Sequence, residues 1–437
     1  MKKRLVYSAL CVLLGLNLFV GAQIYFNSAQ AAEKNSLYQH MELFVGVLDK
    51  IRKEYVEGDK VSYEDLIHGA LKGMLSTLDP HSEFMEAQKF TDLRNDTEGT
   101  FGGVGLEIGL RDNVLTVIAP IDDTPASRAG VLAGDKIIRI EGKSTEKMPV
   151  TDAVKKLRGE PGTPVIITVS RPTLPDPKDI TLTRAVIKFA TVKDIDGHRS
   201  FPLSADKIGY VRLFQFGEPS TAELLEALNK LKTQGMEGLI LDLRDNPGGL
   251  LDQAVKVCEL FLPRGQLVVS TEGRSPQSKQ QFTARGRDQF ASVHIVILVN
   301  GGSASASEIV AGCLQDLRRA LVMGEQTFGK GSVQSIVPLQ DGSALRLTTA
   351  KYYTPSHKVI HEKGITPDSV VPMSLEEEEA LYLKRVQADL TSLSVEQRER
   401  VKNAKDVQLE RAIDFLKAMN LYKGRAQDTR KLAAKRS

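Results

Sequence analysis

Two short segments of this sequence carry residue types that acyl transfer requires. The first, VNGGSASASEIVAG at 299–312, follows an apolar run and leads into a helical pattern, which places serines at a helix N-terminus. Free N–H groups and the positive end of the helix dipole can stabilise an oxyanion there. Ser305 and Glu308 also fit the S-x-x-E capping box, which requires no catalysis. Ser303, Ser305 and Ser307 compete as nucleophile, and the local pattern does not choose among them.

The second segment, GEQTFGKGSVQ at 324–334, offers a base. Lys330 lies between Gly329 and Gly331 after an apolar run, and the two glycines let other backbone come close. Loss of solvation disfavours an ammonium and lowers the lysine pKa, so the neutral amine could accept a proton. The amide oxygen of Gln334 could hold this amine without the negative charge that would keep it protonated. The simpler interpretation of Lys330 is an exposed loop lysine.

A third segment, LILDLRDNPGGLL at 239–251, is an apolar run that ends in Pro247, Gly248 and Gly249. Backbone N–H groups at such a turn can supply half of an oxyanion hole. An ordinary loop between a strand and a helix explains the same residues.

Two histidines suggest a different chemistry. His357 and His361 lie in SHKVIHEKG, but a Ser/His/Asp hydrolase usually carries G-x-S-x-G around its nucleophile, which this chain lacks around Ser305. A His-x-x-x-His pair binds metal when it is helical, and Pro355 and Gly364 favour a loop here. We therefore expect no histidine triad, no metal site and no cofactor.

The pattern along the chain predicts four folded regions that must position these residues. Residues 32–95 indicate helices, and residues 96–172 indicate short strands punctuated by glycine, with two helical pieces. Residues 173–372 alternate apolar strands with helices, which favours an α/β sheet covered on both faces. Residues 373–437 indicate charged helices with a basic tail. The elements expected in 173–372 are strands at 208–214, 238–243, 267–270, 293–299 and 320–323, and helices at 221–233, 251–261 and 305–318.

The N-terminus predicts export. Lys2, Lys3 and Arg4 precede an apolar stretch at 5–26, and Ala-Gln-Ala at 29–31 supplies a small-residue cleavage site. We expect a signal peptide over 1–31 and a periplasmic or otherwise exported protein. The apolar stretch is long enough to act as a membrane anchor where it is not cleaved.

Composition narrows the remaining classes. Apolar residues are 41% and charged residues 26% of the chain, as in globular proteins, and the formal charge of +3 gives no basic stripe for nucleic acid. Cys258 and Cys313 lie on apolar helix faces, where cysteines are most often small core residues, so we expect no disulfide framework. Leu409, Ile413 and Leu416 form a short apolar stripe that fits either a solvated helical extension or a subunit contact.

The glycine-punctuated region resembles a PDZ domain of the circularly permuted bacterial kind. The resemblance rests on Gly103, Val104, Gly105 and Leu106, on the later segment AGVLAGDKIIRIEG, and on the order of the strands. In such domains a glycine loop cradles a peptide carboxylate through backbone N–H groups, while a strand and a helix accept the extended peptide. A tight turn also explains the G-x-G alone.

The whole pattern resembles the carboxyl-terminal processing peptidases, also called tail-specific proteases. GMLSTLDPHSEFM, the PDZ region, DLRDNPGG, GGSASASEIVAG, FGKGSVQ and KGITPD occur in that family's order over about residues 41–372. The resemblance implies Ser305 as nucleophile, Lys330 as general base and Gln334 as the residue that orients the lysine. The interval between Ser305 and Lys330 also matches the family.

The same resemblance implies the rest of the site and a multidomain α/β fold. The oxyanion hole would combine the N–H of Ala306 with one from the turn of Gly248 and Gly249. The core would be related to the crotonase and ClpP type of fold, flanked by helical N-terminal and C-terminal regions, and the PDZ domain would recruit substrate C-termini or gate the site. Arg171, at the end of the PDZ-like region, is a candidate for coupling the PDZ domain to the core.

These observations predict a serine endopeptidase with a Ser/Lys dyad that processes or degrades exported proteins from or near their C-termini. Its partners would be polypeptides, an adaptor protein as in some members of the family, and further copies of the chain bound through terminal helices. The alternative is a PDZ scaffold with a non-catalytic core, which the absence of Ser305 or Lys330 would have favoured. An acyltransferase of crotonase type would need a coenzyme-binding signature that we do not find.

Overall fold

The computed structural model describes Phe19 and residues 37–434, apart from 59–60, 99, 112–113, 122–123, 172–175, 287 and 386–393. The expected signal peptide therefore lies outside the described residues, Phe19 excepted. The chain divides into two compact units, residues 1–84 and residues 85–437. Among the described residues, none of the helices combines the length and the apolar character needed to span a membrane.

The first unit is helical, as the sequence indicates. A helix covers 37–54, and α2 (Tyr63–Ser76) begins after Ser62, whose Oγ accepts the N–H of Asp65 at 2.9 Å. This capping bond satisfies one of the N–H groups that the first turn leaves without a partner. β1 (Glu83–Met85) follows at the boundary of the two units.

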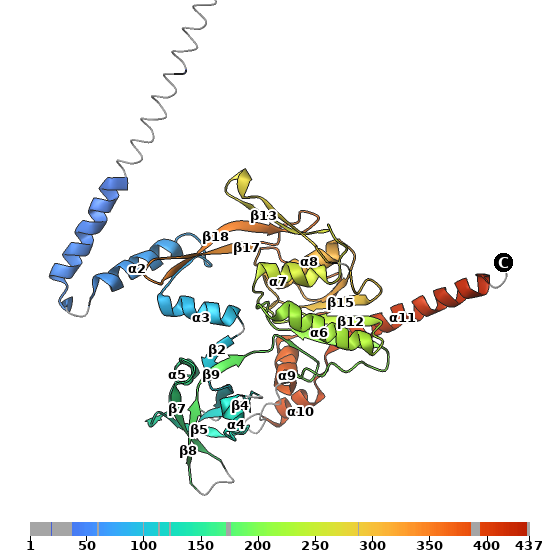
Figure 1. Ribbon diagram of the computed structural model, residues 1–437, viewed down its shortest axis with the longest axis horizontal. Coiled ribbons are helices and arrows are strands. Elements are labelled where there is room, and N and C mark those ends of the chain that lie inside the picture. The colour runs from blue at the N-terminus through green and yellow to red at the C-terminus, as the bar shows by residue number, and fades with distance from the viewer. Residues whose placement is uncertain are drawn as a thin grey trace, which may run out of the picture. The chain divides into compact units, whose positions relative to one another are not determined.

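The PDZ region is a six-stranded antiparallel sheet in the order β3-β4-β5-β7-β8, with β6 paired to β5 (Figure 1). Its strands are β3 (Leu106–Arg111), β4 (Val114–Pro120), β5 (Lys136–Ile140), β6 (Lys143–Ser144), β7 (Pro164–Ser170) and β8 (Lys178–Thr183). Its helices are α4 (Pro125–Arg128) and α5 (Val150–Leu157), close to the helical pieces expected from the sequence. β2 (Thr100–Gly103) pairs with β9 (Ala185–Lys188), and α3 (Ala87–Thr97) precedes β2.

A second six-stranded sheet, in the order β10-β11-β12-β15-β16-β19, forms the centre of the α/β region expected over 173–372. Its strands are β10 (Val192–Lys193), β11 (Ile208–Leu213), β12 (Gly238–Asp242), β15 (His294–Val299), β16 (Leu321–Gly324) and β19 (Ser369–Val370). All neighbours from β11 to β19 are parallel, so the carboxyl ends of β12 and β15 meet at one edge. The segments after these two strands are the ones expected to carry the chemistry.

Helices cover both faces of this sheet, because its strands are apolar on both sides. On one face lie α6 (Ser220–Thr233), α7 (Leu251–Glu259) and α8 (Ala306–Asp316), packed against residues such as Leu239 and Leu241. Cys258 on α7 and Cys313 on α8 are fully buried there as free thiols.

The C-terminal helix covers the other face. After α9 (Leu375–Arg385) and α10 (Val395–Asn403), α11 (Val407–Ala434) brings Leu409, Ala412 and Leu416 against Ile240 and Val296. Leu409, Ile413 and Leu416 thus face the sheet of their own chain. Neither a solvated stripe nor a subunit contact, the two alternatives left by the sequence, describes them.

An antiparallel sheet that the sequence pattern did not predict completes the core. Its strands include β13 (Leu267–Gly273), β14 (Gln280–Thr283), β17 (Ser332–Pro338) and β18 (Ala344–Tyr353), with the 3-10 turn η2 (Pro276–Ser278) before β14. β17 pairs with β18 along its whole length, and the register shifts between Val333 and Gln334. The sequence indicated only the start of β13 and missed β17, the strand that carries Gln334.

Candidate active site

Ser305 occupies a strained position directly before α8. Its φ of 54° and ψ of −112° lie in a region that residues with a side chain rarely adopt. Such a conformation costs about 1–3 kcal/mol and persists where the surroundings impose it. The side chain is half-buried at the N-terminus of the helix, where the N–H of Ala306 has no acceptor within the helix.

The two neighbouring serines have structural partners. Ser303 and Ser307 are fully buried, and their hydroxyls donate to the carbonyls of Leu243 at 2.8 Å and Asn246 at 2.9 Å. Ser303 Oγ also accepts the N–H of Asn300 at 3.0 Å. The structure therefore separates the three serines, because Ser303 and Ser307 donate to loop carbonyls whereas Ser305 is the N-cap residue of α8.

Glu308 joins the serine segment to the lysine segment. Its carboxylate, fully buried, accepts the N–H of Ser305 and of Lys330, both at 2.8 Å, on Oε2. Oε1 accepts the N–H of Gly329 at 2.7 Å and the hydroxyl of Thr327 at 2.5 Å. Burial raises the pKa of Glu308, and the donated hydrogen bonds act in the opposite direction. The sequence suggested a capping box for this residue and gave no sign of the bonds to 327–330.

Lys330 lies where an ammonium is disfavoured. Burial lowers the pKa of Lys330, and the positive charge of Arg346 lowers it further. The backbone around Lys330 requires its two flanking glycines. A Cβ on Gly331 would lie 2.1 Å from the backbone nitrogen of His361, and Gly329 has a φ of 91°, which residues with a side chain rarely adopt. Among the described residues, no hydrogen bond joins the side chains of Ser305 and Lys330.

Gln334 presents an acceptor without a donor. Its Nε2 donates to Thr348 Oγ1 at 2.8 Å and to Ser332 Oγ at 3.2 Å, which fixes the amide plane. Its Oε1 is buried and has no hydrogen-bond partner in the part of the chain that the structure describes. A buried acceptor of this kind costs free energy until a donor reaches it.

The glycine turn after β12 lies directly against the serine. A Cβ on Gly248, whose φ is 101°, would stand 2.7 Å from Ser305 Cβ and 2.9 Å from the nitrogen of Ala306. A Cβ on Gly249 would stand 2.3 Å from the carbonyl oxygen of Phe216. The N–H of Gly248 donates to Asn246 Oδ1 at 2.9 Å, so an oxyanion can use that N–H only when this side chain gives way.

The predicted peptide-binding loop runs from the end of β2 into β3. Gly105 has a φ of 78° and its carbonyl accepts the hydroxyl of Thr124 at 3.2 Å, while Val104 accepts the N–H of Ala126 at 2.9 Å. Gly103 ends β2 and Leu106 begins β3. The loop therefore lies against the start of α4.

Arg171 forms its described polar contacts inside the PDZ region. Its guanidinium binds the buried carboxylate of Asp135 through Nε at 2.5 Å and Nη2 at 2.6 Å, and donates to Gly130 O at 3.1 Å. None of these contacts joins the PDZ region to the core, which is the coupling role expected for Arg171.

The two histidines lie in a loop, and among the described residues neither forms a hydrogen bond with Ser305. His357 Nε2 is 3.0 Å from Glu272 Oε1, and its ring stacks on Tyr353 at 4.5 Å. His361 contacts Gly331 through its backbone. No group of His, Cys, Asp and Glu able to hold a metal ion occurs among the residues that the structure describes.

Comparison with known proteins identifies the class. The model of peptidase family S41 matches residues 207–371, a PDZ domain model matches 116–171, and the model "Activating protease CtpB N-terminal domain" matches 18–89. These matches define a serine peptidase that carries a PDZ domain.

Individual relatives narrow the class to one family. A carboxy-terminal-processing protease of Bartonella bacilliformis is 44% identical over 381 residues, which cover 86% of this chain and 84% of that protein. Carboxy-terminal processing protease CtpB of Bacillus subtilis is 35% identical over 73% of this chain and 67% of its own. A solved photosystem II D1 C-terminal processing protease is 32% identical, with a TM-score of 0.44, over 76% of this chain and 95% of that one. The chain belongs to the carboxy-terminal processing proteases of peptidase family S41.

Proposed function

We propose that this protein is an endopeptidase in which Lys330 acts as general base for Ser305. The neutral Lys330 amine takes the proton from Ser305 Oγ as that oxygen attacks the scissile carbonyl carbon. The ammonium then gives the proton to the leaving amine, and an acyl-enzyme ester remains. A water molecule, deprotonated by the same lysine, cleaves the ester and restores the serine.

Donors at the helix start stabilise the oxyanion of both steps. The N–H of Ala306 is one donor, and an N–H of the turn of Gly248 and Gly249 is the other. Gln334 Oε1 accepts a hydrogen bond from Lys330 and aims the amine at the serine. Its neutrality leaves the pKa of Lys330 low, whereas a carboxylate would raise it.

The observation that carries this proposal is the shared carboxylate of Glu308. It binds the backbone N–H of Ser305 and of Lys330 at the same 2.8 Å, so the two residues are held on one buried group. Around it, Ser305 is strained and the pKa of Lys330 is lowered. Strain and a shifted pKa occur together at functional sites more often than elsewhere.

We further propose that the substrates are exported polypeptides captured by their C-termini. The PDZ domain would hold the terminal carboxylate at the loop of Gly103, Val104, Gly105 and Leu106, and the adjoining strand and helix would hold the residues before it. The names of the relatives refer to carboxy-terminal processing, which fits this substrate class. Export rests on the leader sequence at 1–31.

The test uses the full chain with an unfolded polypeptide substrate in two forms, with a free C-terminal carboxylate and with a C-terminal amide. Ser305→Ala and Lys330→Ala should abolish cleavage, while Lys351→Ala, an exposed lysine on β18, should cleave normally. The amide should raise KM and leave kcat unchanged. Cleavage by Ser305→Ala at the normal rate would contradict the mechanism, and tight peptide binding with no turnover by the natural sequence would favour the scaffold.

We also propose that copies of the chain associate through the helix over 37–54. That helix exposes apolar side chains over much of its surface, including Leu37, Tyr38, Leu43, Val45 and Val47. A monomeric mass across working concentrations would contradict this, and an adaptor protein would then be the alternative occupant.

A further inference from the structure

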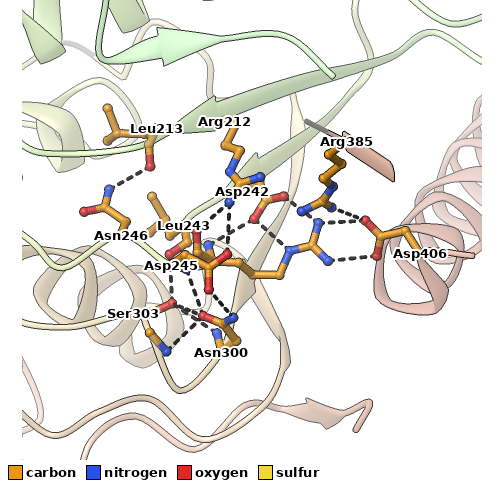
Figure 2. Close-up of polar contacts among 12 residues, drawn as sticks. Arg212, Leu213, Asp242, Leu243, Asp245, Asn246, Asn300, Ser303, Arg385 and Asp406 are labelled. Atoms are coloured by element: carbon orange, nitrogen blue, oxygen red, sulfur yellow. Dashed lines mark hydrogen bonds and ion pairs between the residues drawn. The ribbon is translucent and has the colours of Figure 1, made fainter. Parts of the chain in front are cut away.

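The guanidinium of Arg244 has an acceptor for every donor. Arg244 lies two residues after β12, and its side chain is 4% exposed. Asp242 accepts from Nε at 2.9 Å and from Nη2 at 2.5 Å. Asp406 accepts from Nη1 at 2.8 Å and from Nη2 at 2.9 Å (Figure 2). Gln408 accepts from Nη1 at 3.1 Å. These bonds use all the N–H groups that a guanidinium offers.

Two of these acceptors come from the C-terminal part of the chain. Asp406 directly precedes α11 and caps it by accepting the N–H of Leu409 at 3.0 Å. Arg385 of α9 also binds Asp406. Gln408 is fixed in turn by donating to the carbonyl of Val371 at 2.9 Å. The start of α11 is therefore anchored by charge as well as by its apolar face.

The residues after Arg244 belong to the proposed site. Asp245, with a φ of 60°, donates its N–H to Asn300 Oδ1 at 2.9 Å and accepts from Asn300 Nδ2 at 2.8 Å. Asn246 donates to Leu213 O at 2.7 Å and accepts the N–H of Gly248. The carbonyl of Asn246 accepts the N–H of Ala304 at 3.0 Å. The turn from Arg244 to Gly248 and the segment before Ser305 thus share hydrogen bonds (Figure 2).

We propose that Asp406 is a positioning residue of the peptidase site. By holding the Arg244 guanidinium, it fixes the turn that carries Gly248 and Gly249, and through that turn the backbone that packs against Ser305. The C-terminal helix thereby controls the geometry of the oxyanion hole. This inference deepens the proposed function and rests on it.

The charge of Asp406 is needed to hold Arg244 in place, and the apolar packing of α11 against the sheet does not replace it. Without the Asp406 carboxylate, Arg244 keeps a buried positive charge that Asp242 pairs on one side only. An incompletely paired buried charge moves toward water or another acceptor. The backbone carbonyl of Arg244 accepts a hydrogen bond from Arg212 Nη2 at 3.3 Å, so a shift of Arg244 also displaces the residues in contact with it.

The test compares Asp406→Asn with Leu416→Ala in the full chain. Asn retains the cap of α11 but places an amide against the donors of Arg244. Leu416 is fully buried on the same helix and belongs to the apolar cluster with the sheet, so its truncation weakens docking without removing the carboxylate. We expect Asp406→Asn to lower kcat by at least ~10-fold at nearly constant KM, since misplacement by about 1 Å costs up to ~100-fold. Leu416→Ala should lower Tm and leave kcat of the folded enzyme within about two-fold of the natural sequence.

The outcomes separate this inference from the proposed function. The natural sequence must cleave and Ser305→Ala must not; failure of either removes both proposals. If both of these results are obtained, two outcomes would overturn the positioning role of Asp406 alone. One is a kcat for Asp406→Asn equal to that of the natural sequence, and the other is a loss of kcat in Leu416→Ala as large as that in Asp406→Asn. If Asp406→Asn does not fold, Gln408→Met removes a single acceptor of Arg244. It should lower kcat by at least ~3-fold with KM unchanged, and natural kcat in that variant would equally refute the role.

Discussion

Replacing Glu308 by alanine tests whether a buried carboxylate holds the proposed nucleophile, Ser305, and the proposed base, Lys330, together. The substitution removes the acceptor of three backbone N–H groups, those of Ser305, Gly329 and Lys330. A buried N–H without a partner costs about 1–3 kcal/mol. Water entering the space left by the carboxylate restores part of this, so we expect the free energy of unfolding to fall by about 3–5 kcal/mol.

The kinetic effect should exceed what lost stability explains. Once the segments of Ser305 and Lys330 are no longer joined, a displacement of about 1 Å lowers kcat by ~100-fold. KM should change little, because Glu308 lies beneath the loops and is fully buried. The measurements are steady-state cleavage of an unfolded substrate, with urea unfolding to establish that the variant is folded under assay conditions.

Glu308→Gln is the matched control. The amide oxygen of the substituted glutamine can still accept the hydrogen bonds from the N–H groups of Ser305 and Lys330. The amide nitrogen then faces Thr327, whose hydroxyl can rotate and accept a hydrogen bond from it. Only the N–H of Gly329 then loses its acceptor, at a cost of about 1–3 kcal/mol. Glu308→Gln should therefore keep most of kcat. A folded Glu308→Ala with kcat within about three-fold of the natural sequence would refute the positioning argument.

Substitutions at three further positions test other parts of the protein. Because burial lowers the pKa of Lys330 and a general base must be neutral, the cleavage rate should rise with pH through a midpoint below 10.5. Gln334→Glu should raise the pH of that midpoint by at least about one unit, because a carboxylate stabilises the ammonium. Gln334→Met should lower kcat without raising the pH of the midpoint. Gly331→Ala should abolish cleavage, since its Cβ would meet backbone at 2.1 Å, and a well-folded active variant would contradict the packing. Arg171→Ala leaves the buried carboxylate of Asp135 unpaired and should lower the stability of the PDZ domain by about 3–5 kcal/mol in urea unfolding; an effect on cleavage with no loss of stability would instead support coupling to the core.

The sequence was most informative where one physical signal dominated. The apolar runs at 208–214, 238–243 and 293–299 predicted strands of a sheet covered on both faces, and β11, β12 and β15 lie within them. A short continuous apolar run is typical of a strand that is buried on both faces. β17 was missed because its residues range from buried at Ser332 to exposed at Pro338, without the strict alternation that marks a half-buried strand.

The choice among the serines shows what a local pattern lacks. Ser303 and Ser307 were indistinguishable from Ser305 because their partners, the carbonyls of Leu243 and Asn246, are about 60 residues away in the sequence. The same applies to Glu308, whose match to a capping box concealed its bonds to the lysine segment. The resemblance to the family indicated Ser305 without giving a physical reason. The structural hydrogen bonds of Ser303 and Ser307 provide that reason, because they leave Ser305 as the candidate nucleophile.

The strained and charged groups of this site lie together at one edge of the parallel sheet. Ser305 with its positive φ, the buried carboxylate of Glu308 and the buried guanidinium of Arg244 each cost free energy, and such features persist only where the surrounding structure imposes them. That structure is the sheet with α8 on one face and α11 on the other, which buries Leu416 completely. A chain ending at residue 372, the core boundary expected from the sequence, would expose one face of the sheet and leave Arg244 without Asp406. The C-terminal helix α11 therefore helps to hold the site in its strained conformation. Removal of α11 should disorder the turn of Gly248 under milder conditions than those that unfold the strands of the sheet.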